Sequence, residues 1–518
     1  MSRADGKASR NLTLRRKSVG NMVRSFDVVD ALCVVLMAAG IWAWSTGIVR
    51  RAFDYDEYEH AHVIWLIKSG LRPFYDFFEC HPPFLWYPLA GVLGITGDSY
   101  NILYIFRAIT GLGHILSLVA ICKNVALSLK NLGVSLLRPH QTFILAVCVI
   151  AGQPAILEYL LEFRLDAWPQ FILLISIWRY RRAADVTAFR PALTFGLLAT
   201  AAMLCSPKLL LFLASFVVLN LAVSRDRVTR ALGMAAGAAG TTLLSIGILL
   251  LLRLNPLLVF RFSITYHQML NSLGGFGPGL LNSVRTMPGL LWLVAFGIVA
   301  WAAVLFKAGR ARLTSAAFEI SVLIFLAAQL KVVTTPYKQY YGPWFLLAAL
   351  CFLPYIEASL NRLKPMRAVI CALAVLCAWA NIMESQRRLG TVDGAGRDIA
   401  VREQLELLVP PKVRVVAPAE VRPIFRRDAL YHIATSFART AYDTTLIMEE
   451  LKIQPMSSYF SEEAYLRQMD QTRPGLVLDR GGYTSRQKAA VDTYLRLHAG
   501  EFHEVATPDG PAFVRNVP

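Results

Sequence analysis

Charge is scarce in this chain, and acidic charge is scarcer than basic charge. Only 17% of the 518 residues are charged, whereas an ordinary soluble protein has about 25%. The chain has 53 Lys and Arg but 35 Asp and Glu, and 55% of its residues are hydrophobic. Apolar runs of near-spanning length recur along it. This composition excludes an ordinary soluble domain and is typical of a polytopic membrane protein.

The pattern of the cysteines and of the basic residues excludes other classes. The eight cysteines include no CxxC pair, so neither a disulfide framework nor a zinc ribbon is indicated. A net charge of +18 would suggest nucleic acid as a partner of a soluble protein. Here Lys and Arg cluster in short loops, as the cytoplasmic loops of membrane proteins require. We therefore expect membrane lipids and no nucleic acid as partners.

The apolar runs predict about eleven transmembrane helices, because about 20 residues cross ~30 Å of hydrocarbon. The first run follows a basic tail without a small-residue cleavage site, so we interpret it as a retained signal anchor. With residues 1–26 in the cytoplasm, every inside loop is basic, and the outside loops carry the acids, histidines and tyrosines. The expected spans are 27–49, 100–122, 142–161, 166–179, 191–205, 207–223, 231–254, 288–306, 314–331, 342–360 and 366–382.

Two parts of the chain lie outside this pattern. The segment Phe84–Ile95 follows two prolines and is short, so we expect it to stay in the first outer loop, residues 50–99. After the transmembrane domain, 27–383, the composition becomes charged and mixed. Residues 384–518 are expected to form a soluble α/β domain on the outer, periplasmic face. Its expected strands are Val413–Ala417 and Gly475–Leu478, and its expected helices are Glu462–Met469 and Ser485–Leu497.

The first outer loop concentrates the unusual polar residues of the chain. Between Phe53 and Tyr87 lie four acids within six residues, two later acids and three histidines: Asp54, Asp56, Glu57, Glu59, Asp76, Glu79, His60, His62 and His81. A carboxylate beside a hydroxyl or amine can act as a general base. This loop is therefore the first place to look for a reaction centre.

The other outer loops supply acids and cations that could face the same centre. Glu162, Arg164 and Asp166 form either a water-exposed turn with a local ion pair or part of the cavity that holds Asp56. Lys208 either extends to the interface or contacts an anionic headgroup. The remaining candidates are Arg261, His267, Lys338, Tyr340 and Tyr341, of which the late tyrosines could equally be an interfacial belt. Cations stabilise a departing phosphate most strongly where water is excluded.

A metal site is a weaker candidate. Glu79, His81 and His267 together offer ligands suited to a divalent cation, but their spacing matches no strict metal motif. We therefore expect no certain cofactor, with a divalent cation as the one alternative.

The polar motifs resemble those of a known family. Asp56-Glu57, Asp76-Phe77-Phe78-Glu79-Cys80-His81-Pro82-Pro83, Arg164-Leu165-Asp166 and the late Tyr337–Pro343 loop are similar to motifs of the GT-C glycosyltransferases. Within that superfamily they resemble the protein-mannosyltransferase-like enzymes of glycosyltransferase family 39, which include the aminoarabinose lipid A transferases. The resemblance covers residues 27–360 in layout.

The resemblance implies an activity and a set of roles. The expected enzyme is an inverting glycosyltransferase of a bacterial inner membrane. It would move a sugar from a polyprenyl-phosphate donor to a lipid, glycan or protein acceptor at the periplasmic face. Asp56 would be the essential carboxylate, supported by Glu57, with Asp166 as a second acid. The implied substrate-binding residues are Glu79, His81, Arg164, Lys208, Arg261, His267, Lys338, Tyr340 and Tyr341.

Two departures from the family limit what carries over. Glu59 stands where the aminoarabinose transferases have Arg, and His81 stands where they have Lys, so lipid A is not carried over as the acceptor. The absence of a Ser–His or Cys–His nucleophile pair among the candidates favours a single displacement. The alternatives are a transporter or flippase for a lipid-linked or anionic solute and a scaffold whose outer domain binds a partner. Transporters usually show internal repeats, and this sequence shows none, so the transporter is the less favoured alternative.

Overall fold

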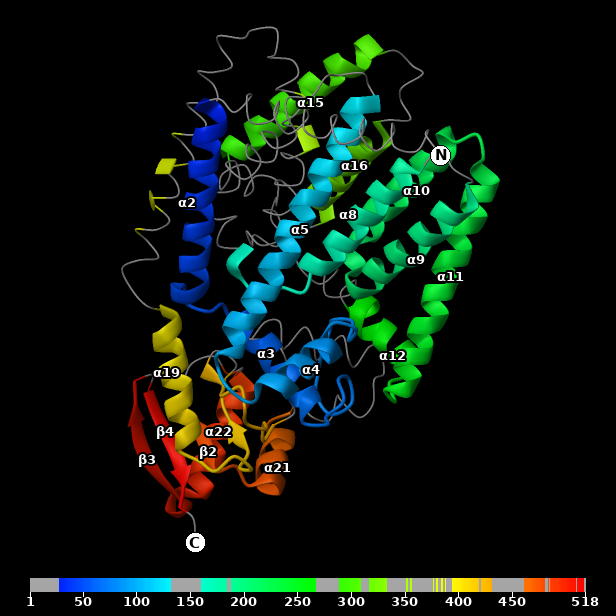
Figure 1. Cartoon of the computed structure of the whole chain (residues 1–518). Helices are drawn as coiled ribbons and strands as arrows, with labels where there is room; N and C mark the ends of the chain where they lie inside the picture. The colour runs from blue at the N-terminus through cyan, green and yellow to red at the C-terminus, as the bar shows by residue number, and fades with distance from the viewer. Residues whose placement is uncertain are drawn as a thin grey trace, which may run out of the picture.

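The apolar runs form a group of long helices that lie side by side (Figure 1). The computed structural model describes residues 28–131, 160–183, 188–266, 288–308, 316–332, 394–418, 421–430, 461–479, 485–508 and 510–516, with isolated positions at 351, 352, 355, 376, 379, 380, 383, 384, 387 and 483. The long helices are α2 (Val28–Arg50), α5 (Ile102–Asn131), α8 (Ala167–Arg182), α9 (Phe189–Cys205), α10 (Leu210–Val223), α11 (Arg227–Leu251), α15 (Pro288–Ala308) and α16 (Ala317–Val332).

These helices follow most of the expected spans. The helix α5 is longer than its span, and a short 3₁₀ turn η1 (Pro207–Leu209) precedes α10. The expected span 142–161 and the last two spans lie almost entirely outside the described residues. In the part of the chain that the structure describes, α5 and α11 alone are long and apolar enough to cross a membrane by length and composition.

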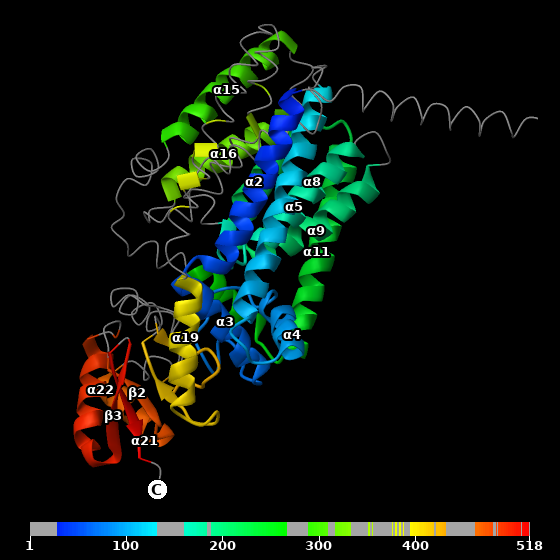
Figure 2. The same cartoon turned by 60° about the vertical axis from the view of Figure 1, so that its left-hand side comes forward.

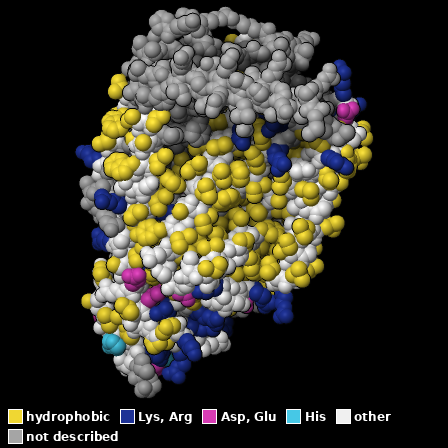
Figure 3. All heavy atoms as spheres, in the orientation of Figure 1, with side chains coloured by type: hydrophobic (Ala, Val, Ile, Leu, Met, Phe, Trp, Pro, Cys, Tyr) yellow, Lys and Arg dark blue, Asp and Glu magenta, His cyan; other side chains and the backbone are white. Residues whose placement is uncertain are grey.

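Small residues bring two of the helices unusually close together. A Cβ atom at Gly196 of α9 would collide with the carbonyl oxygen of Met234 in α11, and one at Gly237 of α11 would collide with that of Leu193. Such close backbone approach is common between membrane helices, where small residues line the interface. Apolar side chains cover the outer face of this helical part, and charged side chains gather toward its lower margin (Figure 3).

The first outer loop is folded rather than extended. It contains α3 (Tyr55–Lys68) and α4 (Trp86–Thr96), which pack against each other. The helix α4 has 11 residues, a length of roughly 16 Å at 1.5 Å per residue, well short of a hydrocarbon core. A helix also forms where a loop was expected, as α12 (Pro256–Phe260) continues into the π-helix η2 (Arg261–Thr265).

The C-terminal residues form an α/β unit at the loop end of the helices, beside α3 and α4 (Figure 2). Its four-stranded sheet has the order β1-β2-β4-β3, with β1 (Val415–Val416) parallel to β2 (Leu476–Leu478). The strands β3 (Phe502–Thr507) and β4 (Gly510–Arg515) form an antiparallel hairpin that the sequence had not predicted. The helices are α19 (Gly394–Leu407), α21 (Glu462–Thr472) and α22 (Ser485–Leu497). Of these, α21 and α22 coincide with the expected helices, whereas α19 was not predicted.

An apolar cluster joins this unit to the outer loops. Phe74 and Phe78 of the first loop contact Phe262 of η2, with ring centroids 5.3 and 5.6 Å apart. The same cluster includes Met469 of α21 and Tyr494 of α22. The first loop is therefore enclosed between the end of α11 and the C-terminal unit, and this fixes the position of α3.

Candidate active site

The start of α3 presents Asp56. Asp54 caps the helix by accepting a hydrogen bond from the backbone N–H of Asp56, and Glu57 completes a capping box. Carboxylates in the first turn of a helix are favoured by its macrodipole. About a third of the Asp56 side chain is exposed, at 32%. Asp56 is thus a carboxylate held at a helix terminus with one side open to solvent.

An arginine fixes the charge of Asp56. Arg164 donates a hydrogen bond from Nη1 to Oδ2 of Asp56. Burial favours the neutral carboxyl, but the Arg164 guanidinium outweighs it, and the pKa of Asp56 is lowered below its ordinary value. Asp56 is therefore ionised at neutral pH and is an acceptor for a proton.

A chain of alternating charges holds Arg164 in place. Glu162 accepts hydrogen bonds from Nε of Arg164 at 3.0 Å and from its Nη2 at 2.8 Å. The other carboxylate oxygen of Glu162 accepts from Nη2 of Arg51, at the end of α2, at 2.6 Å. The expected turn of Glu162, Arg164 and Asp166 thus contains a local ion pair, but Glu162 and Arg164 are buried and not water-exposed. Arg164 also contacts Asp56, as the second interpretation expected.

Glu57 lies beside Asp56 in sequence but has a different environment. Its side chain is fully buried and accepts hydrogen bonds from Nε and Nη2 of Arg107, each at 2.7 Å. It also accepts from the backbone N–H of Phe163 at 2.8 Å and of Asp54 at 2.8 Å. Arg107 donates in addition to the carbonyl oxygens of three residues at the end of α2: Ile48, Arg51 and Ala52. The buried Glu57 therefore joins α3, α5 and the end of α2.

Asp166, the second acid predicted from the sequence, stands at the N-cap position of α8, and its side chain makes no capping hydrogen bond. It accepts hydrogen bonds from Oγ of Ser206 at 2.8 Å and from Nζ of Lys208 at 3.1 Å. Both side chains of the Lys208–Asp166 pair are partly exposed, at 45% and 35%. The lysine is thus an ion partner of Asp166 at an accessible turn.

A second polar cluster lies next to α3. Glu79 is buried, and its Oε1 accepts from the backbone N–H groups of Cys80 and His81, each at 2.8 Å, and contacts Nδ1 of His81 at 2.6 Å. Burial disfavours a charge on His81, but Cys80 and Glu79 outweigh it and raise the pKa of His81 well above its ordinary value. His81 is accordingly a cation at neutral pH, with 37% of its side chain exposed.

His60 and Cys80 belong to this cluster, although the sequence analysis, which named both, gave neither a role in the site. The ring of His60 lies one helical turn after Asp56 and 5.5 Å from the ring of His81. Burial and the neighbouring His81 lower the pKa of His60 to about 4, so its ring is neutral. The i, i+4 spacing from Asp56 was the signal that could have found it. Sγ of Cys80 lies 3.8 Å from Nδ1 of His81, so a Cys–His pair is present here, contrary to the sequence-based expectation.

The remaining predicted site residues are placed only in part. Arg261 is exposed on η2, whose neighbours Phe262 and Tyr266 pack against the first loop. Four other candidates lie outside the described residues: His267, Lys338, Tyr340 and Tyr341. The structure thus brings Asp56, Arg164, His60 and His81 together, with Asp166 and Lys208 forming a second ion pair nearby.

The opposite face of α3 is fastened to the C-terminal unit. Both ring nitrogens of His62 face acceptors, with Nδ1 2.8 Å from the carbonyl oxygen of Ile424 and Nε2 2.8 Å from Oδ2 of Asp428. Arg422 pairs with the other oxygen of Asp428 at 2.8 Å and with Glu59 at 3.7 Å. An oxygen atom of the C-terminal unit thus lies within hydrogen-bond distance of each ring nitrogen of His62. This contact holds the helix that carries Asp56.

Loss of this contact should loosen α3. Asp428→Ala leaves the buried His62 without its carboxylate, and we expect a loss of about 1–3 kcal/mol in unfolding free energy. Hydrogen–deuterium exchange of residues 55–68 should become faster. The matched control is Asp470→Ala, which removes the partner of His498 from an exposed position, 60% accessible. Equal exchange in the two variants would contradict a role for Asp428 in holding α3.

Comparisons with known proteins find a likeness in fold alone. No family model matches the sequence, and no curated protein matches it. The structure of ArnT from Cupriavidus metallidurans bound to undecaprenyl phosphate matches with a TM-score of 0.60 and 14% identity, covering 93% of this chain and 98% of that one. The apo oligosaccharyltransferase of Archaeoglobus fulgidus matches with a TM-score of 0.54 and 12% identity, covering 95% of this chain and 75% of that one. The chain thus shares its fold with ArnT and with this oligosaccharyltransferase, in agreement with the expected resemblance.

Proposed function

We propose that this GT-C fold protein is an inverting glycosyltransferase that uses a sugar linked to a polyprenyl phosphate. The observation that carries the proposal is the placement of Asp56, an ionised and partly exposed carboxylate, beside the cationic His81 on the first outer loop. A base for the acceptor and a cation for an anionic leaving group are the two requirements of such a transfer. The likeness in fold to ArnT, solved with undecaprenyl phosphate, supports the lipid carrier.

The residues suit a single displacement. The hydroxyl or amine of the acceptor attacks the anomeric carbon of the sugar and loses its proton to the ionised Asp56. The bond between that carbon and the phosphate oxygen breaks, and the polyprenyl phosphate leaves with the bonding electrons. His81, with Lys208 and Arg261 as further cations, would hold the departing phosphate. The late-loop residues Lys338, Tyr340 and Tyr341 and the fourth-loop His267 stay predictions from the sequence.

Four predicted site residues take supporting roles in this proposal. Glu57 is fully buried, so it would position the start of α3 without touching substrate. Arg164 would keep Asp56 ionised and oriented, since it spans Asp56 and Glu162. Glu79 would orient His81 through Nδ1. Asp166, the second acid, would hold Lys208 in position by accepting a hydrogen bond from its Nζ.

The proposed architecture follows from charge and from the surface. About eleven helices within residues 27–383 would cross a bacterial inner membrane, with the tail 1–26 in the cytoplasm. Residues 384–518 would form the periplasmic domain that covers the first loop, 50–99. The support is the alternation of basic loops and the apolar outer face of the helical part (Figure 3).

A detergent assay tests the proposed activity. The purified chain is mixed with a labelled polyprenyl-phosphate sugar and a cell-envelope extract, and released polyprenyl phosphate and labelled acceptor are measured. A glycosyltransferase forms both products. A transporter or flippase forms neither, because detergent leaves no second compartment. Absence of both products with every envelope donor lipid would contradict the proposal.

The role of His81 can be tested against metal binding. Ligand atoms of Glu79, Cys80 and His81 lie within 4.8 Å of one another, so a divalent cation is the alternative use of the cluster. If His81 binds phosphate as a cation, His81→Lys keeps KM for the donor close to wild type, and His81→Ala raises it about tenfold or more. EDTA should leave the wild type active. Loss of activity in His81→Lys together with inhibition by EDTA would indicate a metal site instead.

A further inference from the structure

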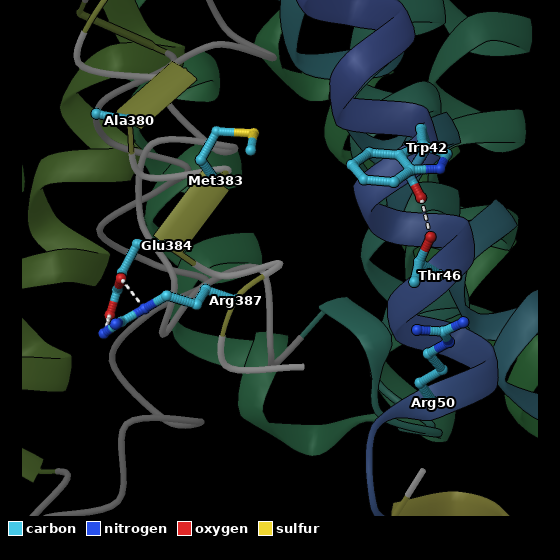
Figure 4. Close-up of a pocket in the computed structure, with 7 residues that line it drawn as sticks. All are labelled: Trp42, Thr46, Arg50, Ala380, Met383, Glu384 and Arg387. Carbon is cyan, nitrogen blue, oxygen red and sulfur yellow. Dashed lines mark hydrogen bonds and ion pairs between the residues drawn. The ribbon is translucent and has the colours of Figure 1, made fainter. Parts of the chain in front are cut away.

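A cavity of about 680 Å³ lies between the end of α2 and the described positions 380, 383, 384 and 387, away from the candidate active site. Figure 4 shows the two walls facing each other across it. From α2 come Trp42, Thr46 and Arg50, which are four residues apart and so share one helix face. The opposite wall consists of Ala380, Met383, Glu384 and Arg387.

The two ends of the cavity differ in character. Trp42 and Met383 lie at the same level and are 56% and 46% exposed, so both present apolar surface to the cavity. The charged side chains lie toward the other end, where Arg50 ends α2 (Figure 4). Glu384 accepts from Nε of Arg387 at 3.1 Å. Among the described residues, Arg50 has no hydrogen-bond or ion-pair partner. With two arginines and one glutamate, the lining carries one net positive charge.

The cavity is separated from Asp56 by α2 itself. The adjacent face of this helix packs inward, because Gly47 lies against Leu161 and Trp44 lies against Gly111 of α5. Arg51 on that inner face binds Glu162, which binds Arg164. A molecule in the cavity would contact the other face of α2 and would not reach the reacting atoms.

We propose that this cavity binds one anionic phospholipid of the surrounding bilayer, which remains in place and does not react. Its phosphate would bind Arg50 and Arg387, and an acyl chain would lie along Trp42 and Met383. The polarity supports this orientation, because the charged end lies at the loop end of α2 and the apolar end lies toward the middle of the helix. The Glu384–Arg387 pair is highly exposed, 36% and 78%, so it is weak and Arg387 can turn to a phosphate. This proposal rests on the proposed membrane location.

A bound headgroup would join two segments that lead to the site. The cavity residues 380–387 precede α19, which contacts α2. Arg50 is followed directly by Arg51, the first member of the charge chain that ends at Asp56. The phospholipid would thus fix the end of α2 relative to the segment that enters the C-terminal unit.

Native mass spectrometry of the full-length chain in detergent tests the proposal. The protein is incubated with phosphatidylglycerol or with zwitterionic phosphatidylcholine. We expect one retained phosphatidylglycerol, bound at least about tenfold more tightly than phosphatidylcholine. Polyprenyl phosphate should not displace it, because that lipid would bind on the Asp56 side of α2. This readout requires no transfer, so its failure is distinct from failure of the proposed enzyme.

Variants locate the bound lipid. In the double variant Arg50→Gln, Arg387→Gln we expect the preference for phosphatidylglycerol to disappear. The matched control is Arg253→Gln. It removes an exposed arginine that follows the C-terminal end of α11 and does not line the cavity. Trp42→Ala should weaken retention of both lipids. It locates the bound lipid if the double variant does not fold. Equal binding of the two lipids by the wild type, unchanged binding by these variants, or displacement by polyprenyl phosphate would each overturn the proposal.

Discussion

Asp56→Asn is expected to lower the rate of sugar transfer by about 10²–10⁴-fold, the usual contribution of a general base. Asn has nearly the same shape but cannot take a proton, so the attacking hydroxyl or amine keeps its proton in the transition state. The change should act on kcat, because in the proposed mechanism Asp56 would contact the acceptor at the reacting group and not the lipid carrier. Transfer from a labelled donor, measured at saturating donor concentration, gives this number.

A control variant distinguishes this effect from the effect of removing any other carboxylate of the first loop. Asp98→Asn removes an exposed carboxylate, 45% accessible, that pairs with Lys68 at 2.5 Å. We expect Asp98→Asn to transfer at nearly the wild-type rate. Thermal unfolding in detergent should show that both variants fold. Wild-type kcat in a folded Asp56→Asn variant would remove Asp56 from the mechanism.

Arg107→Met is expected to produce the largest loss of stability. It leaves the fully buried carboxylate of Glu57 without its cation, which costs about 3–5 kcal/mol. The same change removes the donor for three carbonyl oxygens at the end of α2. Since Glu57 also holds the backbone N–H of Phe163, the start of α3 should lose its fixed position. The unfolding midpoint in detergent should fall steeply, with low yield of folded protein.

A second variant distinguishes charge from packing at this position. Replacing both partners, Glu57→Met with Arg107→Met, should recover part of the lost stability, because no uncompensated charge remains buried. Arg72→Met is the control, since its pair with Asp76 is exposed and 3.6 Å long. Arg72→Met should change stability by less than about 0.5 kcal/mol. A single Arg107→Met variant as stable as that control would contradict a structural role for Glu57.

Local signals in the sequence predicted much of the fold. The helix α22 has the bounds expected from its amphipathic pattern, and the helix α4 begins shortly after two prolines. The contact of Asp56 with Arg164 was one of two open interpretations, because their loops were expected on one face. These features depend on periodicity, turn residues and loop charge, which are properties of short segments.

The parts that were missed depend on contacts between distant segments. The burial of Glu57 follows from Arg107, which lies fifty residues later on α5. The His62–Asp428 contact joins residues that are 366 positions apart. The hairpin of β3 and β4 was also missed, since β3 is largely accessible and lacks a clear apolar alternation. The contact of Cys80 with His81 was not expected, because it depends on the turn formed around Glu79.

Because Cys80 contacts His81, a covalent intermediate on Cys80 is the alternative to a single displacement. The stereochemistry of the transfer distinguishes the two routes. A single displacement with Asp56 as base inverts the anomeric carbon, because the acceptor attacks opposite the leaving phosphate. A covalent intermediate on Sγ of Cys80 would require two displacements and would retain the configuration. The environment favours the first route, since Nδ1 of His81 is much nearer to Glu79, at 2.6 Å, than to Cys80, at 3.8 Å.

The most direct measurement is therefore the anomeric configuration of the sugar before and after transfer, determined by NMR on donor and product. The account predicts inversion, with the same product and a similar rate from Cys80→Ser. Retention of configuration, together with loss of transfer in Cys80→Ser, would contradict the account.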